Sequence, residues 1–246
     1  MTKLLLVATL GIVFLYSCDI SRAEVCPREE IVKENLGKLI NREFRIQRLR
    51  PVSGMEGLCE VVVKVGLRPF VLYTDGKGEN FLVGEMVNAS TKENLTRKTV
   101  EEFMTVSGDI LQKLETLVNM TYGKGEKYVY YVVDPDCPFC KRFSPMLKEW
   151  ASKKGVQVKV ILYPLPIHPQ AKPKTVAMVC DGRGYDDIHK NINTKNQCEK
   201  GKRAIEENLR FLQSIGVSGT PTVIGMNGRY VVGLPRSTDE LDGLIR

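Results

Sequence analysis

The sequence has no apolar run long enough to span a membrane. Its longest apolar stretch, residues 4–16, covers thirteen positions, whereas a membrane-spanning helix needs about 20. Lys3 precedes this stretch, and the tripeptide SRA at 21–23 stands immediately before Glu24. A charged start, a short apolar middle and a small-x-small end are typical of a secretory signal peptide. We therefore predict that residues 1–23 are a signal peptide and that the protein is exported.

The same segment allows a second interpretation. The tetrapeptide LYSC at 15–18 resembles a bacterial lipobox, in which Cys18 becomes the lipidated first residue. Tyr16 fits that pattern poorly, which favours plain secretion. Both interpretations place the protein outside the cytoplasm.

The sequence also lacks any run of five lysines or arginines, although its formal net charge is +7. Basic and acidic residues are interleaved along the chain, whereas a nucleic-acid-binding face needs a clustered basic patch. We therefore expect no nucleic-acid partner. A content of 43% hydrophobic and 26% charged residues is that of a folded protein, neither disordered nor collagen-like.

Cysteine is the informative residue type. Beyond Cys18 the chain has six cysteines: Cys26, Cys59, Cys137, Cys140, Cys180 and Cys198. An even number in an oxidising compartment favours disulfides over metal thiolates. Six cysteines allow fifteen pairings, so the sequence alone fixes none of them. Spacing nevertheless singles out the Cys-x-x-Cys tetrapeptide CPFC at 137–140.

The pattern of apolar residues predicts two units joined by a helix. Residues 24–90 are expected to form a small α+β unit, with a helix to about residue 41 and then strands. The string DGKG at 75–78 separates two strand-like runs and predicts a hairpin. Residues 91–124 have apolar residues at roughly helical spacing and are expected to form a linker helix, with a bend or break at Ser107-Gly108.

Residues 125–246 are expected to form an α/β unit. A strand at 128–133, a helix at 138–153 and a strand at 156–162 make a βαβ unit with parallel strands. Helices near 170–180 and 201–215 follow. The dipeptide Asn227-Gly228 then predicts a hairpin between 222–224 and 230–232, and a short helix over 239–245 closes the chain.

The predicted helix after the first strand places Cys137 at its N-terminus and Cys140 one turn later. The N-terminus of a helix carries unpaired amide groups and the positive end of the helix dipole. Both stabilise a thiolate, which is the nucleophilic form of cysteine. Lys141 and Arg142 add positive potential there or are plain solvated surface.

The alternative for Cys-x-x-Cys is half of a zinc site, which needs two further ligands. The sequence has no second Cys-x-x-Cys, and its only histidines are His168 and His189. His168 lies in a proline-rich loop and His189 follows two aspartates, so we interpret both as surface residues. We therefore predict no metal and no other cofactor.

Two further strings point to a family. The string DCPFC at 136–140 and, about 80 residues later, VSGTP at 217–221 resemble a thioredoxin-fold domain with its cis-proline loop. In the first unit, PVSGM at 51–55 and YTDGK at 73–77 resemble the dimerisation domain of the DsbC/DsbG family of periplasmic disulfide isomerases. Cys-x-x-Cys alone is a modest signal, but all these features together are specific.

The resemblance implies an α+β, cystatin-like dimerisation domain and an α/β thioredoxin-fold domain joined by a linker helix. It implies that Cys137 attacks and is exposed at the helix start, and that Cys140 is buried and resolves. It also implies a cis Pro221, with Thr220 offering backbone groups to an extended substrate. Two copies would pair through residues 24–90 into a V-shaped dimer with an apolar cleft, and a membrane reductase of the DsbD kind would keep the dithiol reduced.

The remaining cysteines divide into two pairs. Cys180 and Cys198 match the family's structural disulfide, which the chain-entropy model values at about 3 kcal/mol. Cys26 and Cys59 depart from the family pattern but could tie the first helix to the sheet; two free thiols are the alternative. The strand before Cys137 lacks the buried acid of some thioredoxins, and Asp134 and Asp136 lie too near the loop for that role, so proton transfer stays unassigned.

The resemblance leaves several activities open. Our first hypothesis is an isomerase of misoxidised exported proteins. A second is a DsbG-like reductase of single oxidised cysteines, because Pro138-Phe139 resembles the dipeptide of that branch. A third is a periplasmic holdase whose thiols are secondary. A simple oxidant like DsbA is disfavoured because such proteins normally lack the first unit.

Overall fold

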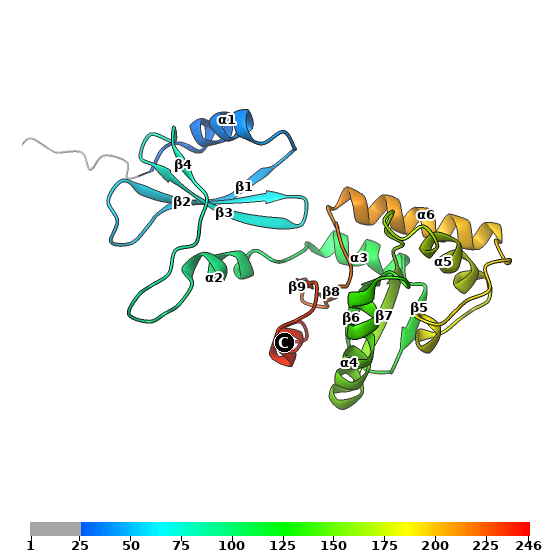
Figure 1. Cartoon of the computed structure of the whole chain (residues 1–246). Helices are drawn as coiled ribbons and strands as arrows, with labels where there is room; N and C mark the ends of the chain where they lie inside the picture. The colour runs from blue at the N-terminus through cyan, green and yellow to red at the C-terminus, as the bar shows by residue number, and fades with distance from the viewer. Residues whose placement is uncertain (1–25) are drawn as a thin grey trace, which may run out of the picture.

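The computed structural model describes residues 26–246, which form two units (Figure 1). The predicted signal peptide and the alternative lipid site Cys18 lie outside the described residues. Within residues 26–246, no helix is both long and apolar enough to cross a bilayer.

The N-terminal unit packs helix α1 (Glu29–Leu39) on one face of an antiparallel sheet. Helix α1 is followed by β1 (Arg45–Pro51), β2 (Leu58–Val65), β3 (Arg68–Asp75) and the short β4 (Phe81–Leu82), which lie in the order β1-β2-β3-β4. Val32 and Leu36, one turn apart on α1, are buried against Val61 and Val63 of the central strand β2. The strand alternation and the helical spacing therefore meet in one small core.

The predicted linker helix over 91–124 is not one continuous helix: it breaks before Gly108, where the sequence predicts a bend or break at Ser107-Gly108. The segment contains two helices, α2 (Leu95–Glu102) and α3 (Gly108–Thr116), and the strand β5 (Met120–Tyr122), which was not predicted. Between the helices, Val106 donates its N–H to the carbonyl of Gly228, and Thr105 forms a bridge with Arg229. The chain breaks here because these backbone groups pair with a distant hairpin instead of within a helix.

The C-terminal unit is a five-stranded sheet in the order β5-β7-β6-β8-β9 with helices on both faces. Its elements are β6 (Lys127–Val133), α4 (Pro138–Lys154), β7 (Val156–Leu162), α5 (Ala171–Cys180), a 3-10 turn (Tyr185–Asp187), α6 (Glu199–Ser214), β8 (Thr222–Gly225), β9 (Tyr230–Val232) and α7 (Thr238–Asp242). Strands β6 and β7 run parallel, and the other neighbours are antiparallel. This order agrees with the predicted α/β unit.

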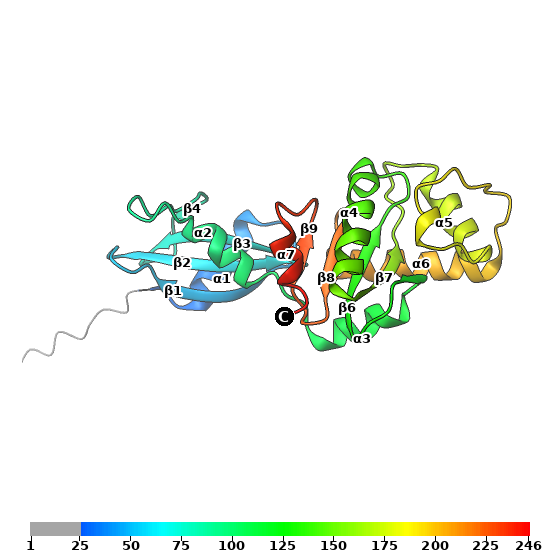
Figure 2. The ribbon, with the colours of Figure 1, turned by 90° about the horizontal axis from the view of Figure 1, so that it is seen from below.

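The central strand β6 is buried on both faces and anchors the loop that follows it. Tyr131 and its alternate neighbours on β6 pack in the core that contains α4 and α7, whereas Tyr130 and Val132 pack in the core that contains α3. Helices α4 and α3 lie on different sides of β6 (Figure 2). A strand covered on both faces is apolar throughout, as the sequence shows. The loop that follows β6 is thus anchored at its base by two cores.

The two units touch at the β2–β3 turn. Tyr230 donates its hydroxyl hydrogen to the carbonyl of Leu67, and the Lys64 ammonium donates to the carbonyl of Thr105 over 2.7 Å. Gly66 approaches Gly216 so closely that a Cβ on Gly66 would lie 2.7 Å from the Gly216 Cα. The turn therefore packs against the loop that leads from α6 to β8.

Candidate active site

The Cys-x-x-Cys motif lies where β6 ends and α4 begins. Cys137 is the N-cap of α4, and Pro138 is its first residue, where a missing N–H is harmless. The Cys137 N–H donates to the carbonyl of Asp134 over 3.3 Å, which closes the loop. Phe143 and Leu147 bury one face of α4, so packing fixes the helix end that presents the thiols.

The predicted cis-proline loop lies directly against the thiols. The Thr220–Pro221 peptide bond is cis, and the Cys137 thiol donates to the Thr220 carbonyl over 3.4 Å. The Thr220 hydroxyl is buried and has no hydrogen-bond partner within residues 26–246. A buried polar atom without a partner costs about 1–3 kcal/mol, so this hydroxyl is available to a group that enters the site.

The expectation of an exposed Cys137 is wrong for the protein with free thiols. Only 3% of Cys137 is exposed, because the loop at Thr220 covers its sulfur, and Cys140 has no exposed surface. Both are free thiols. Burial raises the pKa of Cys140 to about 12, since a thiolate loses its hydration in an apolar environment. Cys140 therefore stays protonated at neutral pH.

Asp134 is a buried acid that the sequence reading set aside. Its side chain is fully buried and accepts from the N–H of Asp136 over 2.7 Å and from the N–H of Leu165 over 2.7 Å. The same carboxylate lies 2.8 Å from Nδ1 of His168. His168 is thus not a simple surface residue: 19% of its side chain is exposed. Asp134 joins the Cys137 loop to the loop after β7.

His189 was also interpreted as a surface residue, but it is partly buried and bonded on both ring nitrogens. Nδ1 lies 2.9 Å from the Pro135 carbonyl, which can only accept, so Nδ1 carries the hydrogen. Nε2 then accepts from the Ser144 hydroxyl over 2.8 Å, and Ser144 accepts from Tyr131 over 2.9 Å. Burial lowers the pKa of His189. These hydrogen bonds together hold Pro135, two residues before Cys137.

The other four cysteines form two disulfides away from the thiols. The sulfurs of Cys26 and Cys59 are 2.02 Å apart, and those of Cys180 and Cys198 are 2.04 Å apart. The first joins the start of the chain to β2, and the second joins the end of α5 to the start of α6. Within residues 26–246, no group of three histidine, cysteine or acidic side chains could hold a metal ion.

Two family models match the chain. The model described as a thioredoxin-like domain matches residues 114–246, which is more than half of the chain, and the model described as the disulfide bond isomerase protein N-terminal domain matches residues 23–97. These two matches correspond to the two units of the structure.

Relatives and solved structures carry related names. The chain is 28% identical over 220 residues to a "Probable thiol:disulfide interchange protein DsbC" of Bordetella parapertussis, covering 88% of this chain and 74% of that protein. It is 22% identical over 188 residues to the thiol:disulfide interchange protein DsbG of Pseudomonas aeruginosa, covering 71% of this chain and 72% of that one. The structure of Helicobacter pylori DsbG is 17% identical, with a TM-score of 0.35, covering 80% of this chain and 99% of that one. The chain belongs to the DsbC/DsbG family of thiol:disulfide interchange proteins and is a thiol-disulfide oxidoreductase.

Proposed function

We propose that the protein isomerises wrong disulfides in exported proteins and that Cys137 is the attacking cysteine. The Cys137 thiolate attacks one sulfur of a client disulfide, the client S–S bond breaks, and the second client sulfur leaves as a thiolate. A different client thiolate then attacks the mixed disulfide and releases Cys137 as a thiolate. The client disulfide is moved, and no net oxidation or reduction occurs.

The difference between the two thiols carries this proposal. Cys137 lies at the start of α4, beside unpaired amide groups and the positive end of the helix dipole. Cys140 lies inside the helix, without exposed surface and with a pKa raised to about 12 by burial. Attack therefore starts from Cys137, and Cys140 stays a protonated thiol until a mixed disulfide has formed.

Cys140 releases the client when no client thiol resolves the mixed disulfide. Its thiol gives up a proton, its sulfur attacks Cys137, and the client leaves as a reduced thiol while Cys137 and Cys140 become a disulfide. Two electrons must then return the pair to the dithiol. We propose a membrane reductase of the DsbD kind as their source.

Thr220 and Pro221 are proposed to hold the client segment next to its sulfur. The Thr220 carbonyl accepts from the Cys137 thiol, and the Thr220 hydroxyl has no partner among residues 26–246. Once Cys137 is in a mixed disulfide its hydrogen is gone, so the Thr220 carbonyl becomes free for a client N–H. Phe139, 54% exposed, offers an apolar contact at the same helix end.

We propose a homodimer formed through the N-terminal unit, within residues 24–90. Strand β4 is at the edge of the sheet, and Leu82 and Val83 are 61% and 77% exposed. An exposed apolar edge strand is a template for pairing with another strand, and the match to the disulfide isomerase N-terminal domain includes it. Two copies would place two dithiols on opposite sides of one cleft.

We further propose that the protein works in the periplasm. The predicted signal peptide and the two disulfides, Cys26–Cys59 and Cys180–Cys198, fit an oxidising compartment. Mass spectrometry of the secreted chain, before and after reduction, tests both pairings and the start of the mature chain.

Refolding of scrambled ribonuclease in a mild redox buffer tests the isomerase. The wild type restores ribonuclease activity, and Cys137→Ala lowers the rate to that of the buffer alone. An equal rate with Cys137→Ala would contradict the assignment of Cys137.

The same variants separate the alternatives. The Pro138-Phe139 dipeptide makes a DsbG-like reductase the second candidate. A reductase of this kind would reduce a cysteine sulfenic acid but would not restore ribonuclease activity. A holdase would bind unfolded protein as well as the wild type does when both Cys137 and Cys140 are replaced by alanine.

A further inference from the structure

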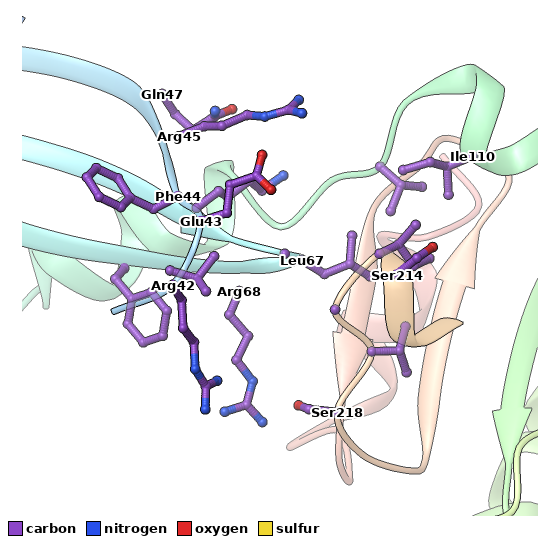
Figure 3. A pocket seen from close by; sticks show the side chains of 18 of the residues that line it. Arg42, Glu43, Phe44, Arg45, Gln47, Leu67, Arg68, Ile110, Ser214 and Ser218 are labelled. Atoms are coloured by element: carbon purple, nitrogen blue, oxygen red, sulfur yellow. The ribbon is translucent and has the colours of Figure 1, made fainter. Parts of the chain in front are cut away.

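A cavity of about 900 Å³ lies between the two units (Figure 3). One wall is formed by residues 42–47 at the start of β1 and by the β2–β3 turn, and the other by the start of α3 and residues 213–218. Ser218, at one end, is two residues before Thr220, whose carbonyl contacts the Cys137 thiol. One end of the cavity is therefore close in sequence to the loop that covers the reactive sulfur.

The wall from the N-terminal unit is strongly basic. It carries four cationic side chains, Arg42, Arg45, Lys64 and Arg68, and one acid, Glu43. In Figure 3 Arg42 and Arg68 point to the side of the cavity where Ser218 lies. The opposite wall adds serine, threonine and glutamine side chains but no charge. The cavity thus has an excess of positive charge with polar neutral groups facing it.

The arginines of this wall have no anionic partner in the described part of the chain. Arg48 and Arg50, farther along the same strand β1, both pair with Glu60, over 3.1 and 2.8 Å. Arg42, Arg45 and Arg68, by contrast, make no ion pair within residues 26–246. Two arginines of β1 outside the cavity are therefore paired with an acid, whereas the three arginines that line the cavity are not.

Strand register brings the cations of this wall together. Arg45 of β1 is directly opposite Lys64 of β2, and Arg68 is opposite Val65, one residue after Lys64. The Lys64 ammonium is already bonded to the Thr105 carbonyl, so the arginines are the cations that an anion in this cavity would pair with.

We propose that this basic cavity binds an acidic stretch of the client polypeptide whose disulfide is attacked by Cys137. The proposal rests on the proposed function, because the client must be held at Cys137 while its acidic stretch reaches the cavity. A polypeptide fits better than a membrane surface, since the charges line a hollow between the two units that a flat surface cannot enter, and Ser218 at its end is two residues from Thr220. The protein then selects clients rich in aspartate or glutamate near the wrong disulfide.

The test uses two peptides that carry one cysteine as a mixed disulfide with glutathione. One peptide has four aspartates and glutamates on either side of the cysteine, and the other has the matching asparagines and glutamines. The second-order rate of reaction with the reduced protein is measured at about 0.05 M and about 1 M salt. We expect the acidic peptide to react about tenfold faster at low salt, and the ratio to approach one at high salt because the charges are screened.

The triple variant Arg42→Glu, Arg45→Glu, Arg68→Glu is expected to bring the ratio of the two rates to one or below. A matched control, Lys33→Glu, Lys77→Glu, Lys200→Glu, changes the net charge equally at exposed positions outside the cavity and should keep the wild-type ratio. A wild-type ratio of one, or an equal fall of the ratio in the control, would overturn the proposal. Anionic vesicles that bind the wild type but not the triple variant, with an unchanged peptide ratio, would assign the cavity to a membrane and also overturn it.

Failure of the Cys137 chemistry would give a different result. Neither peptide would then react at either salt concentration, which overturns the proposed function and the cavity together. A reaction of both peptides at equal rates overturns the cavity alone.

Discussion

At the scale of single residues, the site separates two chemically identical thiols by position. Cys137 is held against a backbone carbonyl at a helix start, and Cys140 is placed where ionisation is costly. The polar groups around them are fixed by hydrogen bonds from distant parts of the chain. Asp134 and His189 bind the backbone of Asp136 and of Pro135, in the short loop before Cys137.

His189 makes a prediction about pH. Because its Nε2 accepts a hydrogen bond and burial lowers its pKa, the folded protein resists protonation of this ring. As the pH falls below the ordinary histidine value of 6.5, the unfolded chain binds a proton that the folded chain does not, so the free energy of unfolding falls. In His189→Gln this fall between pH 7 and pH 5 should be smaller.

Urea unfolding of both proteins at pH 7, 6 and 5 measures this difference. His168, the only other histidine, is the same in both proteins, so its contribution cancels in the comparison. Equal slopes against pH for the wild type and His189→Gln would show that the ring does not titrate differently in the folded state.

At the scale of elements, local signals in the sequence were sufficient for most of the C-terminal unit. The strand–Cys-x-x-Cys–helix order and the Asn227-Gly228 hairpin depend on neighbours in sequence, and both are present. The three-residue β5 is too short to show a periodicity. Ser107-Gly108 marks the break between α2 and α3 locally, but the pairing of Val106 with Gly228 is a distant contact that no local pattern gives.

The same limit applies to the site residues. The positions of Cys137 and Cys140 follow from the motif, whereas His168 meets Asp134 across 34 positions and His189 meets Ser144 across 45. Their loops look like solvated turns until the sheet brings them beside the motif. The basic cavity was likewise hidden, because its cations come from two strand ends and no run of basic residues marks it.

The β2–β3 turn yields a prediction about the contact between the units. Gly66 has a φ of +59°, and a Cβ there would meet the Gly216 backbone at 2.7 Å. Gly66→Ala should lower the free energy of unfolding by about 1–3 kcal/mol through backbone strain and also force the units apart. Small-angle scattering should then give a larger radius of gyration, and the segment between α2 and α3 should be cut faster by protease.

Gly54→Ala is the matched control. Gly54 has a similar φ of +77°, but nothing lies within 4 Å of its Cβ position. Gly54→Ala should lower the free energy of unfolding but leave the radius of gyration and the cleavage rate unchanged. If both variants keep the wild-type radius of gyration and cleavage rate, the turn does not hold the units together.

At the scale of the whole molecule, each unit has its own core and the dithiol lies in only one of them. The N-terminal unit then has two roles in our proposals: it pairs two copies through β4, and it supplies the basic wall beside the Thr220 loop. Both surfaces belong to the same small sheet, β4 at one edge and β1 at the other.

The dimer predicts a response to charge at the β4 edge. Leu82→Asp with Val83→Asp places two acids where apolar side chains are 61% and 77% exposed, so strand pairing would bury unpaired charges. Sedimentation velocity at micromolar concentration should show a dimer for the wild type and a monomer for this variant. Leu39→Asp, at a 67% exposed position on α1, should remain a dimer. A wild-type monomer would contradict the pairing.

The reaction itself is tested most directly by trapping its intermediate. In Cys140→Ala the reserve thiol is missing, so client chains should accumulate as mixed disulfides with the protein under conditions in which the wild type releases them. Mass spectrometry of the trapped species should find every client sulfur joined to Cys137. Absence of such species, or attachment through Cys26, Cys59, Cys180 or Cys198 instead, would contradict attack by Cys137.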